Sequence, residues 1–274
     1  MKIAVCAPAR SIQPLAAARG QAFAALYFPQ AELVYDPQCF VVEGHFAGND
    51  ALRAETLLRY ANDPAFDAIW FARGGYGSNR ILDEVLPALG PAAREKTYMG
   101  YSDMGFLLGA LYARGIGKPV HGPMSTEATE ANRAAPIWRA LAWLTAQDRR
   151  ALEPSLGDGR PGAAFNMAIL TAMLGTPYVP DLTDHVLMLE EVGEAVYRID
   201  RMMWQIARAT QLRGIAGIRL GSVTAITEGA GEAEFGESLD GIMQRWCREM
   251  GVPYLGRARV GHDADNHVVP FGVA

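Results

Sequence analysis

Cysteine is scarce in this sequence of 274 residues, with only Cys6, Cys39 and Cys247. An odd number of cysteines without a C-x-x-C pair argues against a disulfide scaffold and against a zinc knuckle. Cys6 stands in an apolar run typical of a strand, where a thiol usually serves as a small buried hydrophobic group. A reducing compartment is therefore expected.

Basic residues and long apolar runs are scarce as well. Lys and Arg number 25 against 30 Asp and Glu, which gives a net charge of −5. Such a chain offers no positive field to a phosphate backbone, so no nucleic-acid partner is expected. Apolar runs are interrupted within about a dozen residues, which is too short to cross a bilayer. The opening segment MKIAVCAPAR is also too short for a signal peptide, so we expect a cytoplasmic protein without a membrane partner.

Half of the residues are apolar, which is enough for a large core. Within residues 1–145, strand-like runs alternate with helical patterns, which predicts a parallel sheet covered by helices on both faces. Residues 146–162 are charged and rich in Pro and Gly, as in an interdomain linker. Residues 163–274 should form a second, smaller domain. Helices are expected at residues 15–26, 50–62, 80–89, 104–114, 165–174, 197–210 and 239–250, with a closing pair of short strands around Leu255 and Val268.

The segment ARGGYGSNR, residues 72–80, follows a predicted strand. It should lie at the carboxyl edge of the sheet, where open α/β folds bind ligands. Its glycines let backbone N–H groups approach a ligand. The segment lacks the Lys-Ser/Thr of a phosphate-binding loop and the G-x-G-x-x-G order of a dinucleotide site. An anion or oxyanion site is favoured, while a plain tight turn and a nucleotide site stay open.

Ser102 occupies a similar turn in MGYSDMGF, residues 99–106, between a predicted strand and an apolar helix. The unpaired N–H groups of the first helical turn would point toward its hydroxyl, as a nucleophile requires. From these residues alone an ordinary helix cap is the favoured interpretation of Ser102 and a nucleophile is the alternative, and Asp103 also suits the positive end of a helix dipole. The G-x-S-x-G pattern is absent because position 104 is Met. A binding module without catalysis is thus an alternative to an enzyme.

A serine nucleophile needs a base, and the base needs an orienting acid. Among five histidines, His262 lies in a Gly-led loop near the C-terminus, and His121 follows a strand. His262 is the favoured base and His121 its competitor. Glu190 directly follows the apolar run VLML, at the point where a buried strand emerges, and this position suits the role of orienting acid. Glu191 should complement the following helix, and no group of residues has the spacing of a metal site.

Segments along nearly the whole chain together resemble the LD-carboxypeptidase family of serine peptidases, which includes microcin-C-immunity peptidases. The order and separation of the segments carry the resemblance. They are ARGGYGSNR, MGYSDMG, LEEVGEAVYRIDRM and VGHDADNHVVPFG.

The resemblance implies roles for several residues. Ser102 would be the nucleophile, His262 the base and Glu190 the acid that orients it. The oxyanion hole would use the backbone N–H of Gly74 or Gly75 together with that of Asp103. The implied fold joins an N-terminal flavodoxin-like parallel-sheet domain to a smaller C-terminal α/β domain of swivelling-barrel type, with the site between them. No metal or cofactor is implied.

The implied reaction is release of the terminal D-alanine from a murein tetrapeptide during peptidoglycan recycling, through an acyl-enzyme. The substrate would be a small peptide or muropeptide, and family members are commonly dimers, so a homodimer is expected. The alternative is an immunity-type peptidase that cleaves a peptidyl-nucleotide toxin. Ala164 and Phe165 stand where many relatives have glycines, and their bulk is expected to alter the cleft.

Overall fold

The computed structural model describes residues 1–129, 134–227 and 234–274, and its strands form two sheets. The first is a six-stranded sheet in the order β10-β5-β4-β3-β1-β2, in which β10 alone is antiparallel to its neighbour. The parallel part has the strand order 2-1-3-4-5 of flavodoxin-like folds, whose ligand crevice lies at the β1/β3 switch point. The strands are β1 (Lys2–Cys6), β2 (Glu32–Tyr35), β3 (Ala68–Phe71), β4 (Thr97–Gly100), β5 (Lys118–His121) and β10 (Val269–Pro270).

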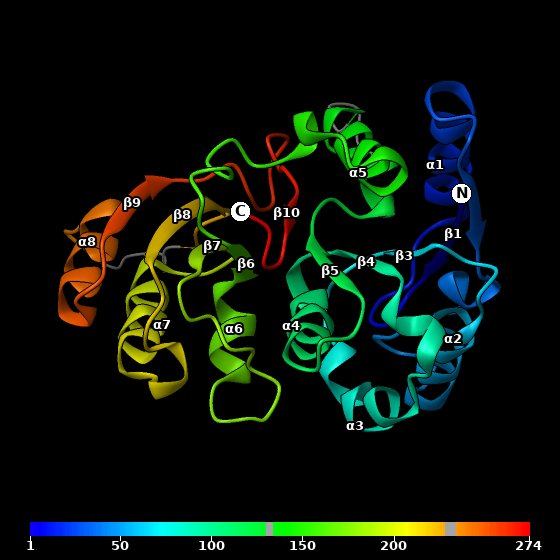
Figure 1. Ribbon diagram of the computed structural model, residues 1–274. Coiled ribbons are helices and arrows are strands. Elements are labelled where there is room, and N and C mark those ends of the chain that lie inside the picture. The colour runs from blue at the N-terminus through cyan, green and yellow to red at the C-terminus, as the bar shows by residue number, and fades with distance from the viewer. Residues whose placement is uncertain (130–133, 228–233) are drawn as a thin grey trace.

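Helices cover both faces of this sheet, as Figure 1 shows. Side chains alternate along β1, so Ile3 and Val5 enter one core cluster while Ala4 and Cys6 enter another. The first cluster is closed by α1 (Pro14–Tyr27) and α5 (Ala134–Ala146), and the second by α2 (Asp50–Asn62), α3 (Leu82–Val85) and α4 (Gly105–Ala113). The buried position of Cys6 confirms that it is part of the core.

The second sheet is four-stranded and parallel, in the order β6-β7-β8-β9. Figure 1 shows its helices together on one face. Its strands are β6 (Gly162–Asn166), β7 (Val186–Val192), β8 (Gly217–Thr224) and β9 (Tyr254–Arg257), and its helices are α6 (Met167–Met173), α7 (Val196–Arg208) and α8 (Leu239–Met250). The predicted fold class, a parallel-sheet α/β domain with a smaller α/β domain, is confirmed.

The two domains meet where α4 lies beside α6 (Figure 1). Glycines on α4 allow this approach, because a Cβ atom at Gly109 would lie 2.6 Å from Met173 Cε and 3.2 Å from Phe165 Cε1. The C-terminal strand β10 also crosses back, since Val269 pairs with His121 of β5. One hydrophobic cluster therefore runs through both domains.

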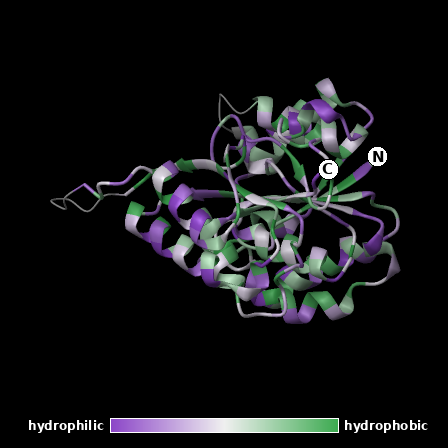
Figure 2. Ribbon diagram, turned by 60° about the vertical axis from the view of Figure 1, so that its left-hand side comes forward, coloured by the Kyte–Doolittle hydropathy of each residue, from purple (hydrophilic) through white to green (hydrophobic). Residues whose placement is uncertain are grey.

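Hydrophilic and hydrophobic residues alternate along the helices in Figure 2, as expected for helices that cover a core with one face. Among the described residues, no helix combines the length and the apolar character that crossing a membrane requires.

Several predicted elements need correction. The helix expected at residues 80–89 is interrupted: α3 spans only Leu82–Val85 and is flanked by short 3-10 turns, the second of which contains Pro87. The helix expected at residues 165–174 begins at Met167, because Gly162–Asn166 form β6. The strands near Leu255 and Val268 do not pair with each other but join different sheets.

Candidate active site

Ser102 lies in the turn from β4 to α4, at the carboxyl edge of the first sheet. Its φ is 60°, in the left-handed region that costs a residue with a side chain about 1–2 kcal/mol. Such strain gathers at functional sites, and a sharp strand-to-helix turn exposes the serine of α/β-hydrolases. Met104, not Ser102, is the N-cap of α4. The backbone therefore presents Ser102 as a nucleophile elbow does, although the sequence pattern of the elbow is missing.

The glycine turn after β3 comes close to this serine. A Cβ atom at Gly74 would lie 3.1 Å from Ser102 Oγ, and one at Gly75, whose φ is 112°, would lie 2.3 Å from Arg10 Cδ. The positive φ of Gly75 favours glycine there, and a side chain at Gly74 would crowd Ser102. Within the described ranges, the N–H groups of Gly74, Gly75 and Asp103 donate no hydrogen bond to the protein. These N–H groups are available to a ligand beside Ser102.

The side chain of Asp103 ties the two turns together. This buried carboxylate accepts hydrogen bonds from the N–H of Ser78 at 2.9 Å and from that of Gly77 at 3.3 Å. The hydroxyl of Ser78 in turn donates to the Asp103 carbonyl at 2.6 Å. Burial raises the pKa of Asp103, and the hydrogen bonds from Ser78 and Gly77 oppose that rise. Its role is to fix the glycine turn against the Ser102 turn rather than to complement a helix dipole.

Glu190 and His262 meet although they are far apart in the sequence. Glu190 is fully buried in β7, and its Oε2 lies 2.7 Å from His262 Nδ1. Because a carboxylate can only accept, Nδ1 donates the proton and Nε2 is left as the acceptor. Gly221 and Gly261 make room for this contact, since a Cβ atom on either would come within 3.0 Å of the Glu190 side chain. The predicted orienting acid thus holds the predicted base in the tautomer that a base requires.

The electrostatics of His262 follow from this pair. Burial by itself lowers the pKa of His262, but the charge and hydrogen bond of Glu190, with smaller contributions from Glu127 and Glu191, raise it above its usual 6.5. The Tyr101 ring packs against the imidazole with centroids 4.7 Å apart. His262 is therefore a basic and well-held imidazole.

A cavity of about 700 Å³ joins these groups. It brings together the side chains of Ser102 and His262, the glycine turn and residues of both domains. Its lining is Arg10, Gln13, Ala16, Arg73, Gly74, Gly75, Tyr101, Ser102, Met124, Thr126, Glu127, Val192 and His262. The predicted nucleophile, the predicted base and the glycine turn therefore face one space.

His121, the competing base, lies outside this lining. Its ring is buried and sits 5.6 Å from the ring of Tyr101, the residue that also contacts His262. Burial first, and then the charge of His262, lower the pKa of His121 to about 3. Neither ring nitrogen has a hydrogen-bond partner among the residues that the structure describes. His121 is a neutral core residue without a route to the substrate, which favours His262.

Comparison with known proteins agrees with this geometry. The model of the LD-carboxypeptidase N-terminal domain matches residues 3–122, and that of the LD-carboxypeptidase C-terminal domain matches residues 163–274. The chain belongs to the LD-carboxypeptidase family. A putative carboxypeptidase of Streptomyces coelicolor is 35% identical over 241 residues, covering 84% of this chain and 74% of that protein. The murein tetrapeptide carboxypeptidase of Pseudomonas aeruginosa is 29% identical over 245 residues, covering 83% and 78%.

Solved structures share the fold. The muramoyltetrapeptide carboxypeptidase of Oxalobacter formigenes superposes with a TM-score of 0.81 at 22% identity, covering 99% of this chain and 93% of that one. MccF in complex with glutamyl sulfamoyl guanosine gives a TM-score of 0.78 at 17% identity, covering 99% and 91%. Family membership and the names of the relatives bear out the predicted enzyme class, a serine carboxypeptidase.

Two features of this member of the family differ from what the sequence predicted. The bulk of Phe165 does not project into the cleft. Its ring is fully buried, contacts α4 and lies 5.1 Å from the Phe271 ring. Ala164 is equally buried, and neither residue lines the cavity. Glu191 caps the preceding helix α6 rather than the following one, because it accepts from Asn166 Nδ2 at 2.8 Å and Ala168 N at 2.9 Å.

Two arginines that support the site were missed. Arg53 is buried, donates to the carbonyls of Pro8 and Gly77 and forms an ion pair with Asp50, so it connects two loops beside the cavity. An Asp and Arg at i, i+3 near a helix start is a common surface pattern, and only the fold shows that this Arg is buried.

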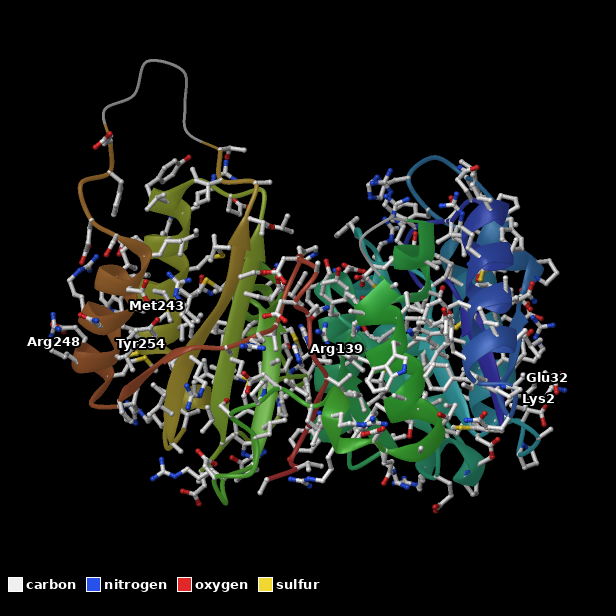
Figure 3. All side chains as sticks on the ribbon, turned by 90° about the horizontal axis from the view of Figure 1, so that it is seen from above. Lys2, Glu32, Arg139, Met243, Arg248 and Tyr254 are labelled. Atoms are coloured by element: carbon white, nitrogen blue, oxygen red, sulfur yellow. The ribbon has the colours of Figure 1, made fainter. Side chains whose placement is uncertain are left out.

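Arg139 on α5 holds the loop that carries His262. It donates to the Asn266 carbonyl at 3.2 Å and lies 3.6 Å from an Asp265 oxygen. Figure 3 shows Arg139 between α5 and the C-terminal segment. The sequence gives no signal for this contact, which joins segments far apart in the chain.

Proposed function

We propose that this protein is a serine LD-carboxypeptidase that releases the terminal D-alanine from murein tetrapeptides during peptidoglycan recycling in the cytoplasm. The observation that carries the proposal is the hydrogen bond between Glu190 and His262, beside a cavity that also contains Ser102 and the glycine turn. The name of the Pseudomonas relative supports the choice of substrate.

The reaction follows from the positions of these groups. His262 Nε2 takes the Ser102 hydroxyl proton as Oγ attacks the carbonyl carbon that precedes D-alanine. The resulting oxyanion accepts hydrogen bonds from the N–H of Gly74 or Gly75 and that of Asp103, and removing one such donor typically costs about 10²–10³-fold in rate. His262 then gives its proton to the amine of D-alanine, which leaves. Water, deprotonated by the same imidazole, hydrolyses the acyl-serine and restores the hydroxyl.

A defined murein tetrapeptide tests the proposal. Mass spectrometry of the products should show a tripeptide and free D-alanine. An aspartyl or glutamyl sulfamoyl nucleoside, offered in parallel, should stay intact. Cleavage of the nucleoside with no release of D-alanine would instead assign the protein to the immunity type, which the likeness to MccF keeps as the second candidate.

The raised pKa of His262 predicts the pH profile. The base acts only when neutral, so kcat/KM should fall as the pH drops through a pKa above 6.5. Glu190 is the main cause of the rise, because its charge stabilises the protonated ring. In Glu190→Gln the acidic limb of the residual activity should therefore move to lower pH. If the acidic limb is unchanged in that variant, it does not report the titration of His262 beside Glu190.

A further inference from the structure

Arg10 and Arg73 bring positive charge to the cavity from two neighbouring loops. Arg10 follows β1 and Arg73 follows β3, and these strands pair directly. Both side chains line the space that contains Ser102. In a sheet of this order, the loops after β1 and β3 flank the switch point where ligands bind. The two arginines therefore stand at the place where the fold receives its ligand.

Their position relative to Ser102 is set by the glycine turn. Arg73 directly precedes Gly74, whose Cβ position lies 3.1 Å from Ser102 Oγ. The stem of Arg10 packs on Gly75, whose Cβ position lies 2.3 Å from Arg10 Cδ. The cations thus flank the N–H groups assigned to the oxyanion.

The charges of this pair are not neutralised within the protein. Neither arginine forms an ion pair with any residue that the structure describes, and Arg73 only donates to the Ser11 carbonyl at 3.4 Å. Burial and the nearby charge of Arg10 lower the pKa of Arg73, which shows that the two cations influence each other. By contrast, the buried Arg53 and the half-buried Arg245 are both paired with carboxylates. The other charged or titratable groups in the lining are Tyr101, Glu127 and His262.

We propose that Arg10 and Arg73 bind the C-terminal carboxylate of the substrate, and so make the enzyme specific for a free peptide end. This rests on the proposed function. The leaving D-amino acid carries its carboxylate one carbon away from the scissile nitrogen, so a substrate whose scissile carbonyl carbon lies against Ser102 Oγ places that carboxylate near the glycine turn. Guanidinium groups bind carboxylates through paired, charge-assisted hydrogen bonds. A peptide that continues beyond this point would leave both cations without a counter-charge.

Two peptides test the proposal, a murein tetrapeptide and its C-terminal carboxamide. Arg10→Gln and Arg73→Gln remove the charge and keep most of the stem. The wild-type enzyme should prefer the acid, and each variant should lower kcat/KM for the acid about 10- to 100-fold while changing that for the carboxamide little. Arg94→Ala, an exposed arginine outside the cavity, is the control for net charge and should retain the preference.

Binding of the same peptides to the Ser102→Ala variant, by calorimetry, separates this proposal from the proposed function. If binding of the acid is preferred and this preference depends on the arginines, but the wild type releases no D-alanine, the carboxylate site is supported and the proposed function is wrong. If D-alanine is released but neither arginine affects the preference for the acid, the proposed function is supported and the carboxylate site is wrong. Binding of neither peptide would overturn both.

Discussion

Replacing Ser102 by alanine is expected to lower kcat/KM by on the order of 10³-fold or more. The change removes only the hydroxyl oxygen, which is the atom that would bond to the substrate carbonyl. The cavity, the glycine turn and the His262–Glu190 pair make no use of that oxygen for their own structure, since Ser102 Oγ forms no hydrogen bond with a described residue. The variant should therefore fold and bind substrate while turnover is lost, as measured by D-alanine release.

Ser102→Gly is the matched control for the backbone. Glycine adopts a φ of 60° without the cost that alanine bears there, so this variant should be more stable to urea than Ser102→Ala by about 1 kcal/mol. It should be equally inactive. Full turnover by either variant would give the nucleophile to another group, whereas binding of the peptide without any turnover by the wild type would make the cavity a binding module.

The arrangement of Ser102 shows what a sequence can convey. The sequence around Ser102 predicted a strand, a short turn and an apolar helix, because the residue pattern of each is distinct. The position at the carboxyl edge of a parallel sheet follows from these elements. The left-handed backbone conformation of Ser102 could not be predicted, since the position holds neither glycine nor asparagine, the residues typical of that conformation. The link from Asp103 to Ser78 was also hidden, because it joins two turns that only the sheet brings together.

The second domain was harder to predict. The run GAAFNMAIL is apolar except for Asn166, so the strand Gly162–Asn166 and the helix after it could not be divided by periodicity. The partner of His262 was indicated by the emergence of Glu190 from a buried strand and by the family resemblance, but its contact depends on Gly221 and Gly261. Contacts between distant segments, such as that of Arg139 with the His262 loop, lie beyond local pattern altogether.

Glu190→Gln is expected to reduce kcat by about 10³–10⁴-fold, as loss of the acid does in other serine triads. The glutamine amide can donate to His262 Nδ1, which would place the imidazole proton on Nε2. In that tautomer Nε2 cannot accept the serine proton. The protein should remain folded, because glutamine has nearly the same volume as the buried glutamate that it replaces.

Glu191→Gln is the control that makes this result specific, since the two glutamates are adjacent in β7 and point to opposite faces of the sheet. Glu191 accepts hydrogen bonds from Asn166, Ala168 and Val192, so its replacement should cost about 1–3 kcal/mol of stability to urea. Its kcat should stay close to that of the wild type. Equal losses of kcat in both variants would mean that catalysis depends on the negative charge of this strand end as a whole, and the assignment of Glu190 as the orienting acid would then be wrong.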